Sequence, residues 1–110
     1  MRRAEIYYKD VVAGILTETN EGQYIFQYDR EYVAKYPDKF ITFSMPVTER
    51  PYGENRLFPF FEGLIPEGWL LDIAAKNWKI NPNDRMGLLL ACCQNCIGAV
   101  SVKPISAEDE

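Results

Sequence analysis

Apolar and polar residues alternate along the first third of the chain in the manner of β-strands. Residues 5–8 and 11–16 are rich in aromatic and β-branched side chains and flank a polar pair at 9–10, which predicts a hairpin. Aromatic side chains then occupy every second position of 24–28, so we expect a third strand after a turn at 19–22. The N-terminal part of the chain is therefore expected to form a small sheet.

The pattern becomes mixed in the next part of the chain. Asp29 can cap a short helix that must end near Pro37, because proline restricts the residue before it. The apolar run 40–45 stops at Pro46 and predicts a fourth strand. Residues 47–55 are polar and contain a further proline and a glycine, so we expect an exposed loop there.

Helices are expected across the region of about 58–94. Pro59 and Pro66 both suit the first turn of a helix, where the missing N–H costs nothing. We therefore expect a short helix over 58–64 and a longer one over 66–78. A last helix follows before the end of this region.

The C-terminal part predicts a helix, a strand and a tail. Asn83 or Asp84 can cap the last helix, and the small and β-branched residues 98–102 are typical of a strand. Domain 1–105 would then be followed by an acidic tail, 106–110. Strands, helices and one closing strand without strict βαβ alternation indicate an α+β fold. We expect a small antiparallel sheet or partial barrel, closed by the C-terminal strand, with the helical region packed on it.

Trp69 lies on the unexpected side of the long predicted helix. At about 100° per residue, the apolar residues gather on one arc, whereas Trp69 lies opposite, flanked by Asp72 and Lys76. A tryptophan on a charged face is unfavourable surface to leave in water. Two interpretations remain open. The ring can fold back over Phe60 or the loop 47–55, or it can anchor a protein interface, where tryptophan is enriched.

Composition narrows the class of protein. The chain has 110 residues, of which 47% are hydrophobic and 25% charged, as in one ordinary globular domain. No apolar run approaches the roughly 20 residues that span a bilayer. The basic start at 1–3 resembles that of a signal peptide, but Glu5, Lys9 and Asp10 interrupt its apolar part, so we expect a cytoplasmic protein with no membrane partner.

Charge and residue types argue against nucleic-acid binding and catalysis. The net charge is −4 and the twelve basic residues are scattered, so we expect no direct contact with nucleic acid. The chain has no histidine, which removes the commonest general base. Gly63 and Gly68 have the spacing of a phosphate loop, but Trp69 and Leu70 replace the residues that would hold phosphate and magnesium. We expect no enzyme activity, catalytic residue, cofactor or metal.

Three cysteines leave one alternative open. Cys93 and Cys96 form a C-x-x-C pair that could be a thiol-redox site or half of a zinc site, and no second pair completes zinc. With Cys92, they can also be small apolar residues at the end of a buried helix. An odd number of cysteines fits a reducing compartment. A small thiol-redox protein that uses Cys93 and Cys96 is therefore an alternative function.

Three motifs occur in an order that resembles a known family. They are a Ser-Met-Pro strand end at 44–46, the corner Phe-Phe-Glu-Gly-Leu-Ile-Pro-Glu-Gly at 60–68, and a Gly-Ala-Val strand at 98–100. In these the chain resembles, over nearly its whole length, the N-terminal subdomain of HipA-like serine/threonine kinase toxins. Those toxins continue into a kinase core, whereas this sequence stops soon after Pro104. It is thus similar to the free-standing HipS antitoxins of split HipB–HipS–HipT systems.

The resemblance implies an antitoxin that binds and inhibits a HipT-like serine/threonine kinase in trans. It also implies a larger complex with a HipB-like helix-turn-helix DNA-binding protein. A noncatalytic structural bridge between the kinase and the DNA-binding subunit is the other possibility. We expect the corner 58–73 to dock on the kinase, with the tryptophan in a partner pocket. The expected partner-binding residues are Trp69, Leu70, Ile73, Glu62, Glu67 and Asp72.

Overall fold

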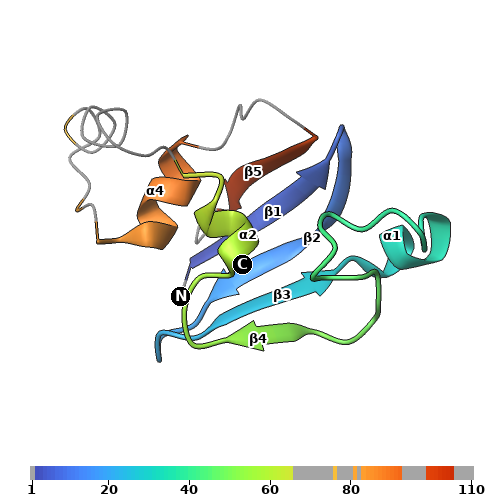
Figure 1. The fold of residues 1–110 in the computed structure, drawn as a ribbon, viewed down its shortest axis with the longest axis horizontal. Helices are drawn as coiled ribbons and strands as arrows, with labels where there is room; N and C mark the ends of the chain where they lie inside the picture. Colours follow the sequence, from blue (N-terminus) through green and yellow to red (C-terminus); the bar gives the residue numbers. More distant parts are fainter. Residues whose placement is uncertain (1, 66–75, 77–80, 82, 93–98, 106–110) are drawn as a thin grey trace.

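The chain forms an α+β fold in which one antiparallel sheet carries helices on one face (Figure 1). The computed structural model describes residues 2–65, 76, 81, 83–92 and 99–105. Five strands follow the spatial order β4-β3-β2-β1-β5, so the first strand along the chain lies beside the last. The strands are β1 (Arg2–Tyr8), β2 (Val11–Glu18), β3 (Tyr24–Tyr28), β4 (Tyr52–Glu54) and β5 (Val100–Ile105).

The predicted hairpin and the predicted third strand are confirmed. β1 and β2 pair antiparallel around the Lys9-Asp10 turn, where Lys9 adopts the left-handed φ of 56° that such a tight turn needs. The turn between β2 and β3 contains Gly22, with a φ of 83°. A side chain at Gly14 would collide with the carbonyl oxygen of Gln27, so only glycine fits where β2 and β3 approach each other.

Three helices are described, and all three were expected. They are α1 (Arg30–Lys35), α2 (Pro59–Glu62) and α4 (Arg85–Cys92). Asp84 caps α4, because its Oδ1 accepts a hydrogen bond from the N–H of Gly87 at 3.1 Å. Asp29 does occupy the N-cap position of α1, but its side chain makes no capping hydrogen bond there. The predicted helix 66–78 and tail 106–110 lie outside the described residues, apart from Lys76, which is helical.

The core lies between the sheet and the helices α2 and α4, which cover the same face of the sheet (Figure 1). Phe61 of α2 is fully buried, and its ring centroid lies 5.8 Å from that of Phe26 on β3. The largest fully buried side chains come from strands and helices alike. They are Phe26, Phe61, Ile6, Leu16, Met86, Leu88, Leu89 and Val102.

Two predictions for the segment between α1 and α2 were wrong. Residues 40–45 form no regular strand, and a single bridge joins Thr42 to Met45 across a turn. Their burial does not follow the two-residue period of a strand, because Ile41 and Met45 are buried whereas Phe43 is exposed. Part of the expected loop 47–55 instead forms the edge strand β4, which pairs with β3 through main-chain hydrogen bonds that need no apolar pattern.

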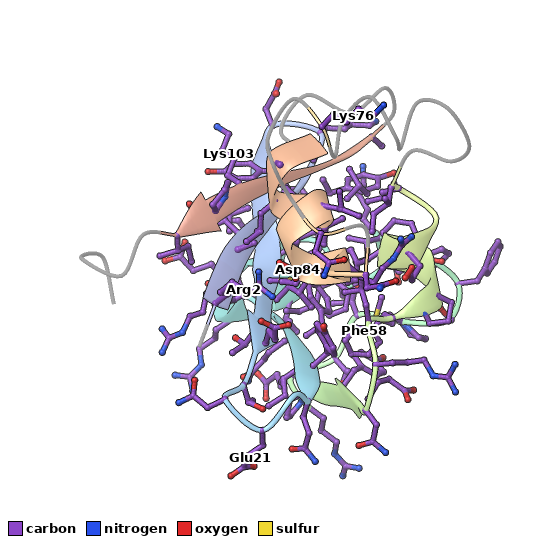
Figure 2. All side chains as sticks on the ribbon, turned by 90° about the vertical axis from the view of Figure 1, so that its left-hand side faces the viewer. Arg2, Glu21, Phe58, Lys76, Asp84 and Lys103 are labelled. Atoms are coloured by element: carbon purple, nitrogen blue, oxygen red, sulfur yellow. The ribbon has the colours of Figure 1, made fainter. Side chains whose placement is uncertain are left out.

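Arg2 joins the sheet to the start of α4. Its Nε donates to Glu18 on β2 at 2.6 Å, and its two terminal nitrogens donate to both carboxylate oxygens of Asp84, at 2.8 and 3.0 Å. Figure 2 shows Arg2 and Asp84 facing each other. The hydrogen bonds from Arg2 lower the pKa of both Glu18 and Asp84, and the two carboxylates raise that of Arg2.

Replacing Arg2 with alanine is expected to lower the free energy of unfolding by about 1 kcal/mol at neutral pH, since the pair with Asp84 is bidentate but both ion pairs of Arg2 are partly exposed. A carboxylate whose pKa is lower in the folded state stabilises the fold at every pH above its pKa in the unfolded state. This stabilisation is lost as the pH falls through the pKa of the folded state. Urea unfolding should therefore show a smaller difference between wild type and variant well below pH 4.5. Arg50→Ala, at an exposed position, is the control. An equal difference at every pH would contradict this account.

Candidate partner-binding site

Phe43 is the most exposed large hydrophobic residue in the described part of the chain. Its side chain is 88% exposed, at the turn that Met45 closes by donating its N–H to the carbonyl of Thr42 at 3.1 Å. The ring of Phe40 lies 5.1 Å away and is itself 36% exposed. Paired aromatic rings in water are unfavourable in an isolated domain and mark surfaces that bind another molecule.

Tyr28 holds both sides of this turn. It is 3% exposed and comes from β3, and its ring packs edge-on against Phe26 at 4.9 Å. Its hydroxyl donates to the carbonyl of Met45 and accepts from the N–H of Ile41 at 3.1 Å. The backbone on each side of Phe43 is therefore fixed to the sheet by one buried side chain.

Two further tyrosines fix the ends of the same segment. Tyr32 of α1 donates its hydroxyl to the carbonyl of Lys39, and Tyr52 of β4 donates to the carbonyl of Pro46 at 2.6 Å. Residues 39–46 are thus pinned by three elements of the fold. Such a segment presents Phe43 on ordered backbone, which lowers the conformational entropy that binding must remove.

Burial keeps these hydroxyls protonated. It raises the pKa of Tyr28 to about 12, and it raises the pKa of Tyr32 and Tyr52 above the ordinary value of 10. The pKa of Tyr24 on β3 is also raised, to about 12, mainly by burial and secondly by its hydrogen bond to Glu18. All four phenols therefore remain hydrogen-bond donors throughout the physiological range.

These pKa values predict alkaline unfolding. A tyrosine whose pKa is higher in the folded state stabilises the fold fully at every pH below its pKa in the unfolded chain, near 10. This stabilisation is lost as the pH rises toward 12, the pKa of Tyr28 in the folded state. We expect the free energy of unfolding in urea to change little between pH 8 and 9 and to fall above pH 10. Tyr28→Phe, which lacks the hydroxyl, should show a shallower fall. A steep loss already below pH 9 would contradict the assignment.

A hollow of about 430 Å³ opens beside Phe43. Phe60 and Leu64, from α2 and the turn after it, line this hollow together with Phe40 and with Tyr8 at the end of β1. Phe60 and Leu64 belong to the corner 58–73, which is predicted from the sequence to dock on the kinase. We call the set Tyr8, Phe40, Phe43, Phe60 and Leu64 the aromatic surface.

One of the predicted partner-binding residues lies within the described part. The carboxylate of Glu62 on α2 accepts from the Nε of Arg85 on α4 at 2.7 and 3.1 Å, so it links the two helices. The other predicted residues lie outside the described residues and stay predictions, and so do the paired cysteines. They are Trp69, Leu70, Ile73, Glu67, Asp72, Cys93 and Cys96.

Phe40 and Phe43 were not among the predicted partner-binding residues, because the apolar run 40–45 predicts a strand. No local signal separated this turn from a strand, because Ile41 and Met45 would also share one face of a strand.

Among the residues that the structure describes, no group of three His, Cys, Asp or Glu side chains could hold a metal ion. Within the same residues, no helix has the length and apolar character needed to cross a membrane. The aromatic surface offers apolar area and ring faces, the features of a protein interface.

Comparison with known proteins agrees with this fold. The family model of the HipA N-terminal domain matches residues 4–103. An uncharacterized protein of Haemophilus influenzae is 30% identical over 103 residues, which cover 94% of this chain and 92% of that protein. The solved N-terminal domain of a HipA toxin is 26% identical and has a TM-score of 0.74, with 97% of this chain and 95% of that one covered. The chain therefore belongs to the HipA N-terminal domain family.

Proposed function

We propose that this chain is a noncatalytic antitoxin subunit that binds a HipA-like serine/threonine kinase of the HipT type in trans and restrains its activity. Membership of the HipA N-terminal domain family supports the choice of partner. The observation that carries the proposal is the exposed Phe43 ring on its pinned turn, next to Phe60 and Leu64. We place the complex in the cytoplasm, together with a HipB-like DNA-binding protein.

The aromatic surface suits a stable interface. Exposed aromatic rings on ordered backbone lose their contact with water when a partner covers them, and they bring little conformational entropy to lose. A standard interface buries about 800 Å² on each partner, more than these rings alone supply. Further contacts must therefore surround Phe43.

The rest of the corner 58–73 is proposed to supply those contacts. Trp69 would enter a pocket of the kinase, with Leu70 and Ile73 as apolar neighbours. At the rim would lie acidic side chains, which give specificity more than affinity. Glu62 already forms an ion pair with Arg85, so its negative charge is partly balanced before binding. The proposed rim residues are Glu62, Glu67 and Asp72.

Co-expression with a tagged HipT-like kinase tests the proposal. We expect the chain to copurify with the kinase and to reduce its phosphorylation activity as the chain is added. Trp69→Ala should weaken binding by about 2 kcal/mol, as loss of an anchoring tryptophan commonly does. Lys103→Ala, on an exposed position of β5, is the control.

The possible outcomes distinguish an inhibitor of the kinase from a structural bridge and test the role of Trp69. A kinase that copurifies but keeps its full activity would replace inhibition with a structural bridge to the DNA-binding subunit. No copurification would contradict both. Equal inhibition by wild type and Trp69→Ala would remove the tryptophan from the interface.

A further inference from the structure

A second hollow continues the aromatic surface past Tyr8. It encloses about 200 Å³ and is lined by Tyr8, Lys9, Val11, Tyr32, Tyr36 and Lys39. Tyr8 lines both hollows, so the apolar one beside Phe43 and this one form neighbouring parts of a single surface. The volume suits one side chain rather than a large ligand.

The walls of this hollow are aromatic and ordered. Tyr32 lies between two other tyrosines, with its ring centroid 5.2 Å from that of Tyr36 and 5.9 Å from that of Tyr28. Val11 at the margin is 40% exposed. An anion that entered here would have few water contacts on the wall side, which strengthens its attraction to nearby cations.

The two lysines supply such cations. Lys9 sits in the β1–β2 turn, where its N–H donates to the carbonyl of Ala99, and its Nζ lies 5.8 Å from the centre of the Tyr8 ring. The backbone of Lys39 is fixed by the hydroxyl of Tyr32. In the part of the chain that the structure describes, no ion pair involves either ammonium group.

We infer that this hollow receives the carboxylate of an Asp or Glu side chain from the partner protein, within a segment whose apolar residues cover the aromatic surface. This inference rests on the proposed function and specifies which kind of partner segment the chain recognises. Two lysines line this hollow, one of them, Lys9, with its ammonium group near the Tyr8 ring, and their positive charges complement one carboxylate. The adjoining hollow takes an apolar neighbour. The partner segment is therefore apolar and acidic, in adjacent positions.

Charge reversal tests the inference. The double variant Lys9→Glu/Lys39→Glu should bind the HipT-like kinase at least tenfold more weakly than wild type, and the salt dependence of the association rate should fall. Lys103→Glu is the control for one such charge reversal, because Lys103 lies on the opposite face of the sheet, with its Nζ over the ring of Tyr7 (Figure 2). That control should stay within twofold of wild type. Thermal unfolding of each variant checks that the fold is kept.

Carbodiimide coupling identifies the partner group. This reagent joins an amine to a carboxylate in contact, so peptide mapping of the wild-type complex should find Lys9 or Lys39 joined to an Asp or Glu of the kinase. Coupling only at other lysines would overturn the inference. A complex that loses affinity on phosphatase treatment and shows no coupling at these two lysines would also overturn it, in favour of a phosphorylated residue.

The failure of this inference is distinguishable from that of the proposed function. If wild type binds the kinase and the double variant binds equally well, only the carboxylate site is overturned. If wild type does not bind the kinase at all, both are overturned.

Discussion

Phe43→Asp should abolish most of the binding to the partner kinase while leaving the fold as stable as before. Phe43 is 88% exposed in the free chain, so its ring contributes little to folding. In the proposed complex the ring is covered, and loss of an aromatic anchor costs about 2 kcal/mol or more. The buried carboxylate adds a desolvation penalty. We expect binding to weaken by at least about 3 kcal/mol, which titration calorimetry would measure as more than a hundredfold.

A matched control separates this effect from a change in net charge. Gln23→Asp adds the same charge at an exposed position in the turn between β2 and β3, at the other end of the sheet from Phe43. It should bind within about twofold of wild type. Equal weakening by both substitutions would indicate general electrostatic repulsion and would contradict an anchor at Phe43.

Phe61→Ala should have the largest effect on stability. Phe61 is fully buried, with the rings of Phe58, Phe60 and Phe26 at centroid distances of 6.0, 5.2 and 5.8 Å. Truncation leaves a cavity where α2 meets the sheet, and such changes cost about 3 to 5 kcal/mol. Chemical denaturation should show this loss as a lower midpoint with little change in slope.

Controls for Phe61 must allow for a variant that does not fold, because a domain has only about 5 to 15 kcal/mol of stability in total. Phe61→Leu keeps most of the volume and should cost about 1 to 2 kcal/mol. Phe40→Ala removes a ring that is 36% exposed and should cost less than Phe61→Ala. A loss below 1 kcal/mol for Phe61→Ala would contradict its central place in the core.

The features that the sequence predicted well are those set by nearby residues. The hairpin around Lys9-Asp10 depends on alternation and on a polar turn, and the start of α2 depends on Pro59 at the first helical position. Asp84 caps α4 through a residue three positions away. Such signals lie within a few residues of one another and can be recognised without knowledge of the fold.

The features that were missed depend on contacts between distant segments. The turn at Phe43 is set by the hydroxyl of Tyr28, which lies 17 residues before Met45. The link from Arg2 to Asp84 spans 82 residues. β4 forms because β3 offers an unpaired edge, which no local pattern reveals. The aromatic surface could therefore be predicted only in part, through Phe60 and Leu64.

The central claim is that Phe43 contacts the partner kinase, and photocrosslinking tests it most directly. A photoreactive phenylalanine analogue would replace Phe43 in one sample and Lys103, on the other face of the sheet, in a second. In complexes with a HipT-like kinase, position 43 should crosslink to the kinase and position 103 should not. Crosslinking from position 103 with none from position 43 would contradict the account.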